Sequence, residues 1–200
     1  MKMLGALALS SLVLIAGAAN AQSRVESPPD PYVHRGTGFA MPAKVGDFVR
    51  GTVTEYNAEA SDAGANYDLI VDGQSVATVT VYVYPPASLG NPAGADGCKA
   101  SFDGAKQAIV DRFPDARLQR DETLPAPDPD AQVTGAHAAY TLRGDFFSPG
   151  GEITSDIYLY CPGDASWHVK YRVSAPADTP RSAEVKAFMN ALEWPESLGG

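Results

Sequence analysis

Residues 152–174 read EITSDIYLYCPGDASWHVKYRVS. Apolar and polar residues alternate on both sides of a Pro-Gly-Asp turn signal, which predicts two antiparallel strands at 152–161 and 167–174. A register that matches apolar side chains across the hairpin makes three pairs: Leu159 with Val169, Ile157 with Tyr171, and Cys161 with Trp167. The hairpin therefore predicts one apolar and one polar face.

The polar face of this hairpin is the candidate binding surface. In the predicted register Asp156 lies opposite Arg172, and a turn at 148–151 brings Arg143 beside it. One interpretation is cross-strand ion pairing on a solvated face, which contributes less than about 1 kcal/mol per pair. The other is recognition of a small anionic ligand or an acidic partner, because two arginines around one carboxylate leave donors free. The candidate residues are Arg143, Asp156, Tyr158, Tyr160, His168, Lys170 and Arg172.

Working outward, the chain alternates short strands with two helices. Strands are predicted at 48–56, 67–71, 76–84 and 133–146, and a helix at 98–113, where apolar residues recur at steps of three and four. A second helix is expected after Thr179 and Pro180, which suit its N-cap and first position. The order β-β-β-α-β-β-β-α predicts an α+β domain, an antiparallel sheet of about six strands with two packed helices.

The predicted core lies on one side of this sheet. It consists of Val79, Val81, Val83, Ile157, Leu159, Val169 and Tyr171, with Phe102, Ile109, Phe188 or Leu192 against them. The other side carries four tyrosines, Tyr82, Tyr84, Tyr158 and Tyr160. They suit either a second core layer under a helix or the wall of a ligand groove.

The amino-terminal residues have the composition of an export signal. Lys2 precedes an apolar run at 4–18, and Ala19-Asn20-Ala21 is a small-x-small cleavage pattern, so residues 1–21 are predicted to be a signal peptide. The run is shorter than the ~20 residues that cross a bilayer, so we expect no membrane insertion after cleavage. Residues 22–43 are rich in proline and predict a tether, and 44–196 predict a single domain in the periplasm or the medium.

Two cysteines, Cys98 and Cys161, remain in the exported chain. In an oxidising compartment they favour a disulfide, and only one pairing exists. A metal pair, a catalytic thiol or two inert buried thiols are the alternatives. A zinc site requires further Cys or His residues at short spacing, and the sequence has none there.

The remaining features favour a protein without catalysis. The net charge of −9 argues against binding nucleic acid. No nucleophile elbow, Walker loop, dinucleotide-binding glycine pattern or zinc-protease motif occurs, so neither a cofactor nor a metal is predicted. The leading hypothesis is an exported binding, accessory or assembly protein. The alternatives are a hydrolase-like enzyme with a site built from distant residues, and an envelope scaffold that docks through the Pro-rich segment.

The second half of the chain resembles the Mog1/PsbP/DcrB-like group of small α+β proteins. The resemblance lies in the helix at 98–113, the Ala136-x-x-x-Tyr140 strand, the hairpin at 153–174 and the closing helix with Val185, Phe188, Met189 and Leu192. It implies a non-enzymatic binding, assembly or accessory role. The chain also resembles secreted proteins of Gram-negative bacteria, which implies a periplasmic location. The alternatives for a partner are an envelope protein and a small anionic ligand.

The signal peptide generates the first testable prediction. We expect cleavage after Ala21, so the secreted protein should begin at Gln22. Intact-mass analysis of protein recovered from a secreting host measures this directly. A mature protein that still begins at Met1 would contradict the prediction.

Overall fold

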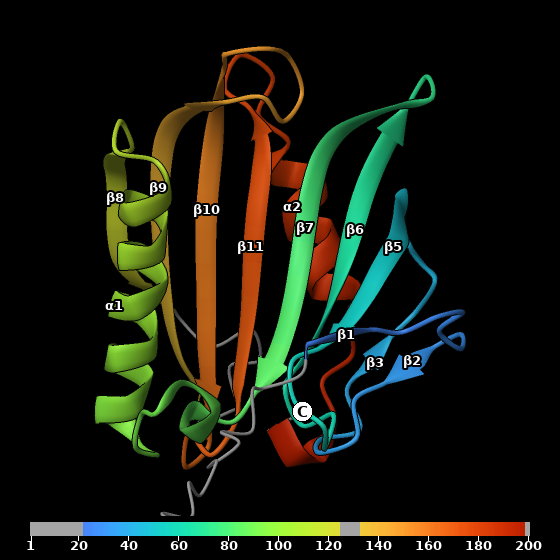
Figure 1. Ribbon diagram of the computed structural model, residues 1–200, viewed down its shortest axis with the longest axis vertical. Helices are drawn as coiled ribbons and strands as arrows, with labels where there is room; N and C mark the ends of the chain where they lie inside the picture. The colour runs from blue at the N-terminus through green and yellow to red at the C-terminus, as the bar shows by residue number, and fades with distance from the viewer. Residues whose placement is uncertain (1–21, 125–132, 199–200) are drawn as a thin grey trace, which may run out of the picture.

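The computed structural model describes residues 22–124 and 133–198, so the expected signal peptide lies outside the described residues. The fold is α+β, with one large antiparallel sheet and two helices, as the sequence predicts (Figure 1). The sheet has nine strands rather than about six, because short strands near the amino terminus and one polar edge strand join it.

The strand order in the main sheet is β1-β5-β6-β7-β11-β10-β9-β8, and β4 also pairs with β5. The bounds are β1 Ser23–Arg24, β4 Lys44–Val45, β5 Phe48–Glu55, β6 Ala63–Val71, β7 Gln74–Tyr84, β8 Arg117–Leu124, β9 Val133–Gly144, β10 Gly151–Pro162 and β11 His168–Pro176. A separate two-stranded sheet consists of β2 (Tyr32–Val33) and β3 (Ala40–Met41). The two hairpin-rich halves of the chain meet where β7 pairs with β11.

Two helices, α1 (Ala95–Arg112) and α2 (Ser182–Ala191), cover different halves of the sheet from opposite sides (Figure 1). Phe102 and Ile109 of α1 pack in one core cluster with Ile157 and Leu159 of β10. The second cluster joins α2 to β5, β6, β7 and β11; its members include Val79, Val81, Val169, Tyr171, Val185 and Phe188. In the part of the chain that the structure describes, neither helix is long and apolar enough to cross a membrane.

The pairing of β10 with β11 differs from the predicted register by one residue. Leu159 lies opposite Lys170, and Tyr160 lies opposite Val169. Because side chains alternate between faces, this shift sends the apolar residues of the two strands to opposite sides of the sheet. The single-sided core that we predicted is therefore wrong, although Val81 is fully buried as expected. Matching apolar with apolar fails here because β10 contributes to the core under α1, whereas β11 contributes to the core under α2.

The segment predicted to be a tether is packed against the domain. Tyr32, Phe39 and Met41 are buried in the α2 core cluster. The Arg50 guanidinium donates hydrogen bonds to the carbonyls of Met41 and Pro29, the latter at 2.7 Å. Proline limits regular hydrogen bonding, but large apolar residues placed between the prolines still find a buried surface.

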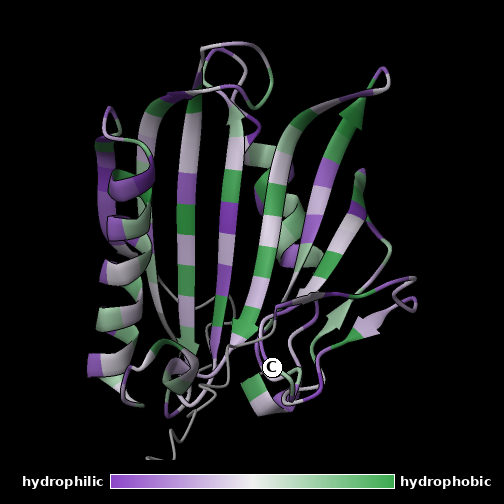
Figure 2. Ribbon diagram, in the orientation of Figure 1, coloured by the Kyte–Doolittle hydropathy of each residue, from purple (hydrophilic) through white to green (hydrophobic). Residues whose placement is uncertain are grey.

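Two further elements differ from the sequence-based expectation. Strand β8 is exposed along its length except for half-buried Leu124, so it lacks the apolar alternation that marks a strand (Figure 2). Its polarity suits an edge strand, which pairs only with β9. Helix α2 begins at Ser182 after Arg181, and the Thr179 hydroxyl donates to Asp178, so Thr179 is not the N-cap.

The predicted disulfide is confirmed between Cys98 and Cys161. Their Cα atoms are 6.0 Å apart, within the range that a disulfide requires. Cys98 lies in the first turn of α1, and Cys161 lies near the end of β10, so the bond joins the helix to the sheet that it covers. No free cysteine is present among the described residues.

Removing this bond should destabilise the protein. The cysteines are separated by 63 residues, and the chain-entropy model gives an upper value of about 4 kcal/mol for a loop of this size. We expect the Cys98→Ser/Cys161→Ser variant and the reduced wild type to lose similar amounts of unfolding free energy in urea. Two free thiols in unfolded, unreduced wild-type protein would contradict the bond.

Candidate functional site

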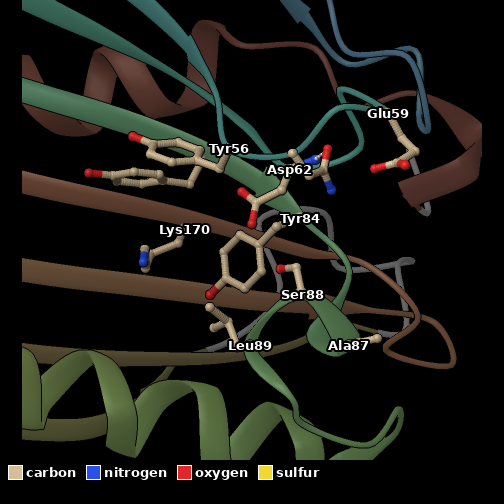
Figure 3. Close-up of a pocket in the computed structure, with 10 residues that line it drawn as sticks. Tyr56, Glu59, Asp62, Tyr84, Ala87, Ser88, Leu89 and Lys170 are labelled. Atoms are coloured by element: carbon tan, nitrogen blue, oxygen red, sulfur yellow. Dashed lines mark hydrogen bonds between the residues drawn. The ribbon is translucent and has the colours of Figure 1, made fainter. Parts of the chain in front are cut away.

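One cleft lies on the same side of the sheet as α1, beyond the edge of this helix, at one end of β7 and β11. Its cavity volume is about 490 Å³. The loop between β5 and β6 forms one wall, and the 3-10 helix η1 (Pro86–Leu89) forms another (Figure 3). Its lining includes three tyrosines, a lysine, a carboxyl and a hydroxyl: Tyr56, Tyr82, Tyr84, Lys170, Asp62 and Ser88. The cleft thus combines aromatic surface with a few polar groups, which is typical of small-molecule sites.

Lys170 and Tyr82 form the floor of the cleft. They are directly opposed in the pairing of β11 with β7. The Lys170 Nζ lies 4.4 Å from the centre of the Tyr82 ring and 5.2 Å from the centre of the Tyr84 ring. The Tyr82 ring lies close over Gly64 of β6, where any Cβ would come within 3.0 Å of the ring. Glycine at that position therefore makes room for the aromatic floor.

The β5–β6 loop brings Asp62 and Tyr56 to the cleft. The Asn57 side chain holds this loop, because its Oδ1 accepts hydrogen bonds from the backbone N–H of Ser61 at 2.9 Å and of Asp62 at 3.3 Å. The Tyr56 N–H donates to the Asp62 carbonyl at 2.7 Å and closes the loop. The Tyr56 and Tyr82 rings lie 6.0 Å apart. Local hydrogen bonds thus hold the loop backbone that carries both side chains.

The surroundings of Lys170 lower its pKa and so disfavour its protonated form. Burial lowers its pKa to about 8; Asp62 acts in the opposite direction, and the positive charge of Arg172 lowers the pKa further. Within the described ranges Lys170 forms no ion pair. Arg172 is also without an ion pair there, and its Nε donates to the Ser155 hydroxyl at 3.0 Å. Two cations therefore share one face of β11 without a bound counter-charge.

Three other polar groups of the cleft, on Tyr56, Asp62 and Tyr84, are also partly shielded from water. Burial raises the pKa of the Asp62 carboxyl and that of the Tyr84 phenol, and it raises the pKa of Tyr56 to about 12. The Tyr84 hydroxyl is buried and has no hydrogen-bond partner among residues 22–124 and 133–198. An unpartnered buried hydroxyl is costly, so a ligand that supplied a partner would be stabilised.

His168, one of the predicted binding residues, lies behind the cleft. Its ring packs edge-on against Tyr84, with ring centres 5.4 Å apart. The side chain is fully buried, and burial lowers its pKa to about 4, so the imidazole is neutral at neutral pH. His168 does not line the cleft and therefore supports Tyr84 from the side of the core.

The predicted binding residues do not share one surface. Lys170 and Arg172 point to the face of the cleft, whereas Asp156, Tyr158 and Tyr160 point to the α2 face, because of the one-residue register shift. The predicted neighbourhood of Arg143 and Asp156 is also wrong. Arg143 pairs with Glu152, four residues before Asp156, and Asp156 lies opposite Ala139.

Sequence reasoning missed most of the cleft lining. Tyr56, Asp62 and Ser88 come from a loop and a 3-10 helix in the first half of the chain, which no motif connects to β11. The available signal was the row of Thr and Tyr residues that alternates with valine in β7. Only the pairing of β7 with β11 reveals that this row lies beside Lys170.

A second polar cluster occupies the α2 face, centred on His137. Its Nε2 lies 2.8 Å from an Asp156 carboxylate oxygen, and its Nδ1 lies 3.2 Å from a Glu122 carboxylate oxygen. The ring stacks on Tyr158, with centres 4.2 Å apart. Burial opposes the imidazolium, but hydrogen bonds and charges of the two carboxylates outweigh it and raise the pKa of His137. The cluster is internally paired, and it links β8, β9 and β10.

The comparisons of this chain with protein-family models and with curated proteins found no match. The resemblance to the Mog1/PsbP/DcrB-like group therefore stays a prediction, and the cleft geometry is the basis for inferring function.

The His137 cluster generates a pH prediction. A histidine whose folded pKa is raised stabilises the fold fully below its unfolded pKa of about 6.5, and that contribution is lost as the pH rises through the folded value. Compared with His137→Gln, the wild type should be more stable at pH 5 by about 1 kcal/mol, because a hydrogen bond to a charged group exceeds a neutral one by about that amount. The advantage should shrink from pH 6.5 upward.

Urea unfolding of both proteins between pH 5 and 9 measures this difference. His168 is present in both proteins, so its titration cancels when the two are compared. A stability difference that stays constant across this range would contradict a charged His137 clamp.

Proposed function

We propose that this protein is an exported, non-catalytic binding module that takes a small organic anion in the Lys170 cleft. One observation carries the proposal: the Lys170 amine lies inside the cleft, against the Tyr82 and Tyr84 rings, and has no carboxylate paired with it among the described residues. Export is supported by the signal-peptide pattern and by the disulfide, which is typical of oxidising compartments.

The charged groups in and beside the cleft determine the sign of the charge that a ligand should carry. A cation held away from water is costly when no counter-charge is near, and a ligand carboxylate would supply that charge. Arg172, two residues along the same face of β11, adds to the positive potential. Asp62 and Glu59 line the opposite wall and would repel a second negative group. These charges favour a ligand with one carboxylate rather than a polyanion.

The aromatic walls restrict the shape of the ligands that fit the cleft. Three tyrosine rings line a cleft of about 490 Å³, which is large enough for a single ring with a short substituent. Planar ligands stack on tyrosine with little loss of side-chain entropy, because the rings are already fixed by packing. An aromatic monocarboxylate is thus the ligand class that the cleft fits best.

Calorimetric titration with benzoate tests this proposal. We expect Lys170→Met to weaken benzoate binding by about tenfold to a hundredfold, since a charge-assisted hydrogen bond contributes about 1.5–3 kcal/mol. Lys99→Met is the matched control, because Lys99 is exposed on α1 and pairs with Asp103 away from the cleft. Benzylamine, which has the same ring but a positive charge, should not bind.

The proposal is contradicted if benzoate does not bind to wild-type protein, or if it binds equally to wild type and Lys170→Met. Equal losses in the Lys170 and Lys99 variants would indicate a general effect of net charge instead of a site.

A further inference from the structure

We propose that Lys170 forms a reversible imine with carbonyl compounds, and that the ligand class of the cleft is 2-oxo acids. This inference rests on the proposed function, because the carboxylate of the ligand is held by the same positive site. It adds a covalent bond between the Lys170 Nζ and the carbonyl carbon of the ligand.

The location of the amine supports this chemistry. Lys170 lines an open cleft, so a ligand carbonyl can reach its Nζ, and the tyrosine rings beneath the amine exclude water from one side (Figure 3). The other lysines that the structure describes are either ion-paired or exposed to solvent. Lys106 is paired with Asp103 and Asp121, Lys99 is paired with Asp103, and Lys44 and Lys186 are exposed to solvent.

The protonation state of the amine separates Lys170 from these lysines. Only the neutral amine is a nucleophile, and burial together with the Arg172 charge lowers the pKa of Lys170 to about 8. At pH 7.5 roughly a quarter of such an amine is neutral, against roughly one part in a thousand for an exposed lysine. Ion pairing acts the other way in Lys106, whose pKa is raised by Asp121 and Asp103 despite partial burial.

The cleft also holds the proton donor that imine formation requires. The neutral Lys170 nitrogen attacks the carbonyl carbon, and a proton moves from nitrogen to oxygen to give a carbinolamine. The Asp62 carboxylate, whose pKa is raised by burial, takes up the proton that Lys170 loses before the attack and returns it to this hydroxyl, which leaves as water while the nitrogen lone pair forms the C=N bond. The products are an iminium cation, one water molecule and the Asp62 carboxylate, which neutralises the iminium.

The ligand carboxylate is favoured by a second positive charge. Arg172 does not line the cleft, but it lies two residues along the same face of β11 and its charge acts on Lys170. In a 2-oxo acid the carboxylate is bonded directly to the carbonyl carbon, so imine formation leaves it beside the iminium and in the positive potential of Arg172. An aldehyde without a carboxylate lacks this attraction and should react more slowly.

Reductive trapping tests the inference on the secreted protein. Phenylglyoxylate, a 2-oxo acid with one aromatic ring, is incubated with the protein and cyanoborohydride, and the product is analysed by intact mass and peptide mapping. We expect one adduct per chain, located on Lys170. Mandelate, which has a hydroxyl where phenylglyoxylate has the carbonyl, should give none. Lys170→Arg keeps the positive charge and should lose the adduct, whereas Lys99→Arg should keep it.

A competition experiment needs no variant. Excess benzoate should slow the trapping of Lys170 in wild-type protein at least tenfold, because it occupies the cleft without a carbonyl. The inference is overturned if phenylglyoxylate yields no Lys170 adduct although benzoate binds, or if adducts spread evenly over Lys44, Lys99 and Lys186. Absence of binding by both benzoate and mandelate would instead overturn the proposed function.

Discussion

The two helices cover opposite faces of the sheet, and each covers only part of it. This constraint organises the rest of the molecule. Where α1 lies over β8, β9 and β10, that face must be apolar, and where α2 lies over β5, β6, β7 and β11, the other face must be apolar. Neighbouring strands β10 and β11 therefore bury opposite sets of side chains, which is the reason that Leu159 lies opposite Lys170.

Uneven coverage also explains where a site can form. Beyond the edge of α1 the sheet continues with polar residues on the same face, and η1 and the β5–β6 loop rise on either side of it. Hydrophobic residues in that position would be exposed, so Thr, Tyr, Lys and Arg occupy it (Figure 2). The cleft is thus a product of the fold's incomplete second layer, and the disulfide holds α1 at its border.

Sequence patterns predicted the elements better than their faces. Alternation in β7, β10 and β11, helical spacing in α1, and the Cys98–Cys161 bond follow from local residues and from a single available pairing. The register of β10 and β11 could not be predicted from local residues, because the hairpin was aligned on the assumption that both strands contribute to the same core. Arg143, Asp156 and Lys170 were consequently placed on one face, although Asp156 and Lys170 lie on opposite faces of the sheet and Arg143 pairs with Glu152. Buried Phe39 and Met41 show that proline content alone does not define a tether.

The two charged clusters differ in how each charge is balanced. The His137 imidazolium lies between Asp156 and Glu122, so its hydrogen bonds are used inside the fold, and it serves to join three strands. Lys170 lies over two tyrosine rings, whose faces attract a cation, but burial and the second cation beside it disfavour its charge, and no carboxylate is paired with it among the described residues. A group whose charge the fold already balances has little to gain from a ligand. A group whose charge the fold leaves unbalanced gains from an anion or from losing its proton, and both outcomes are chemistry at the same atom, the Lys170 Nζ.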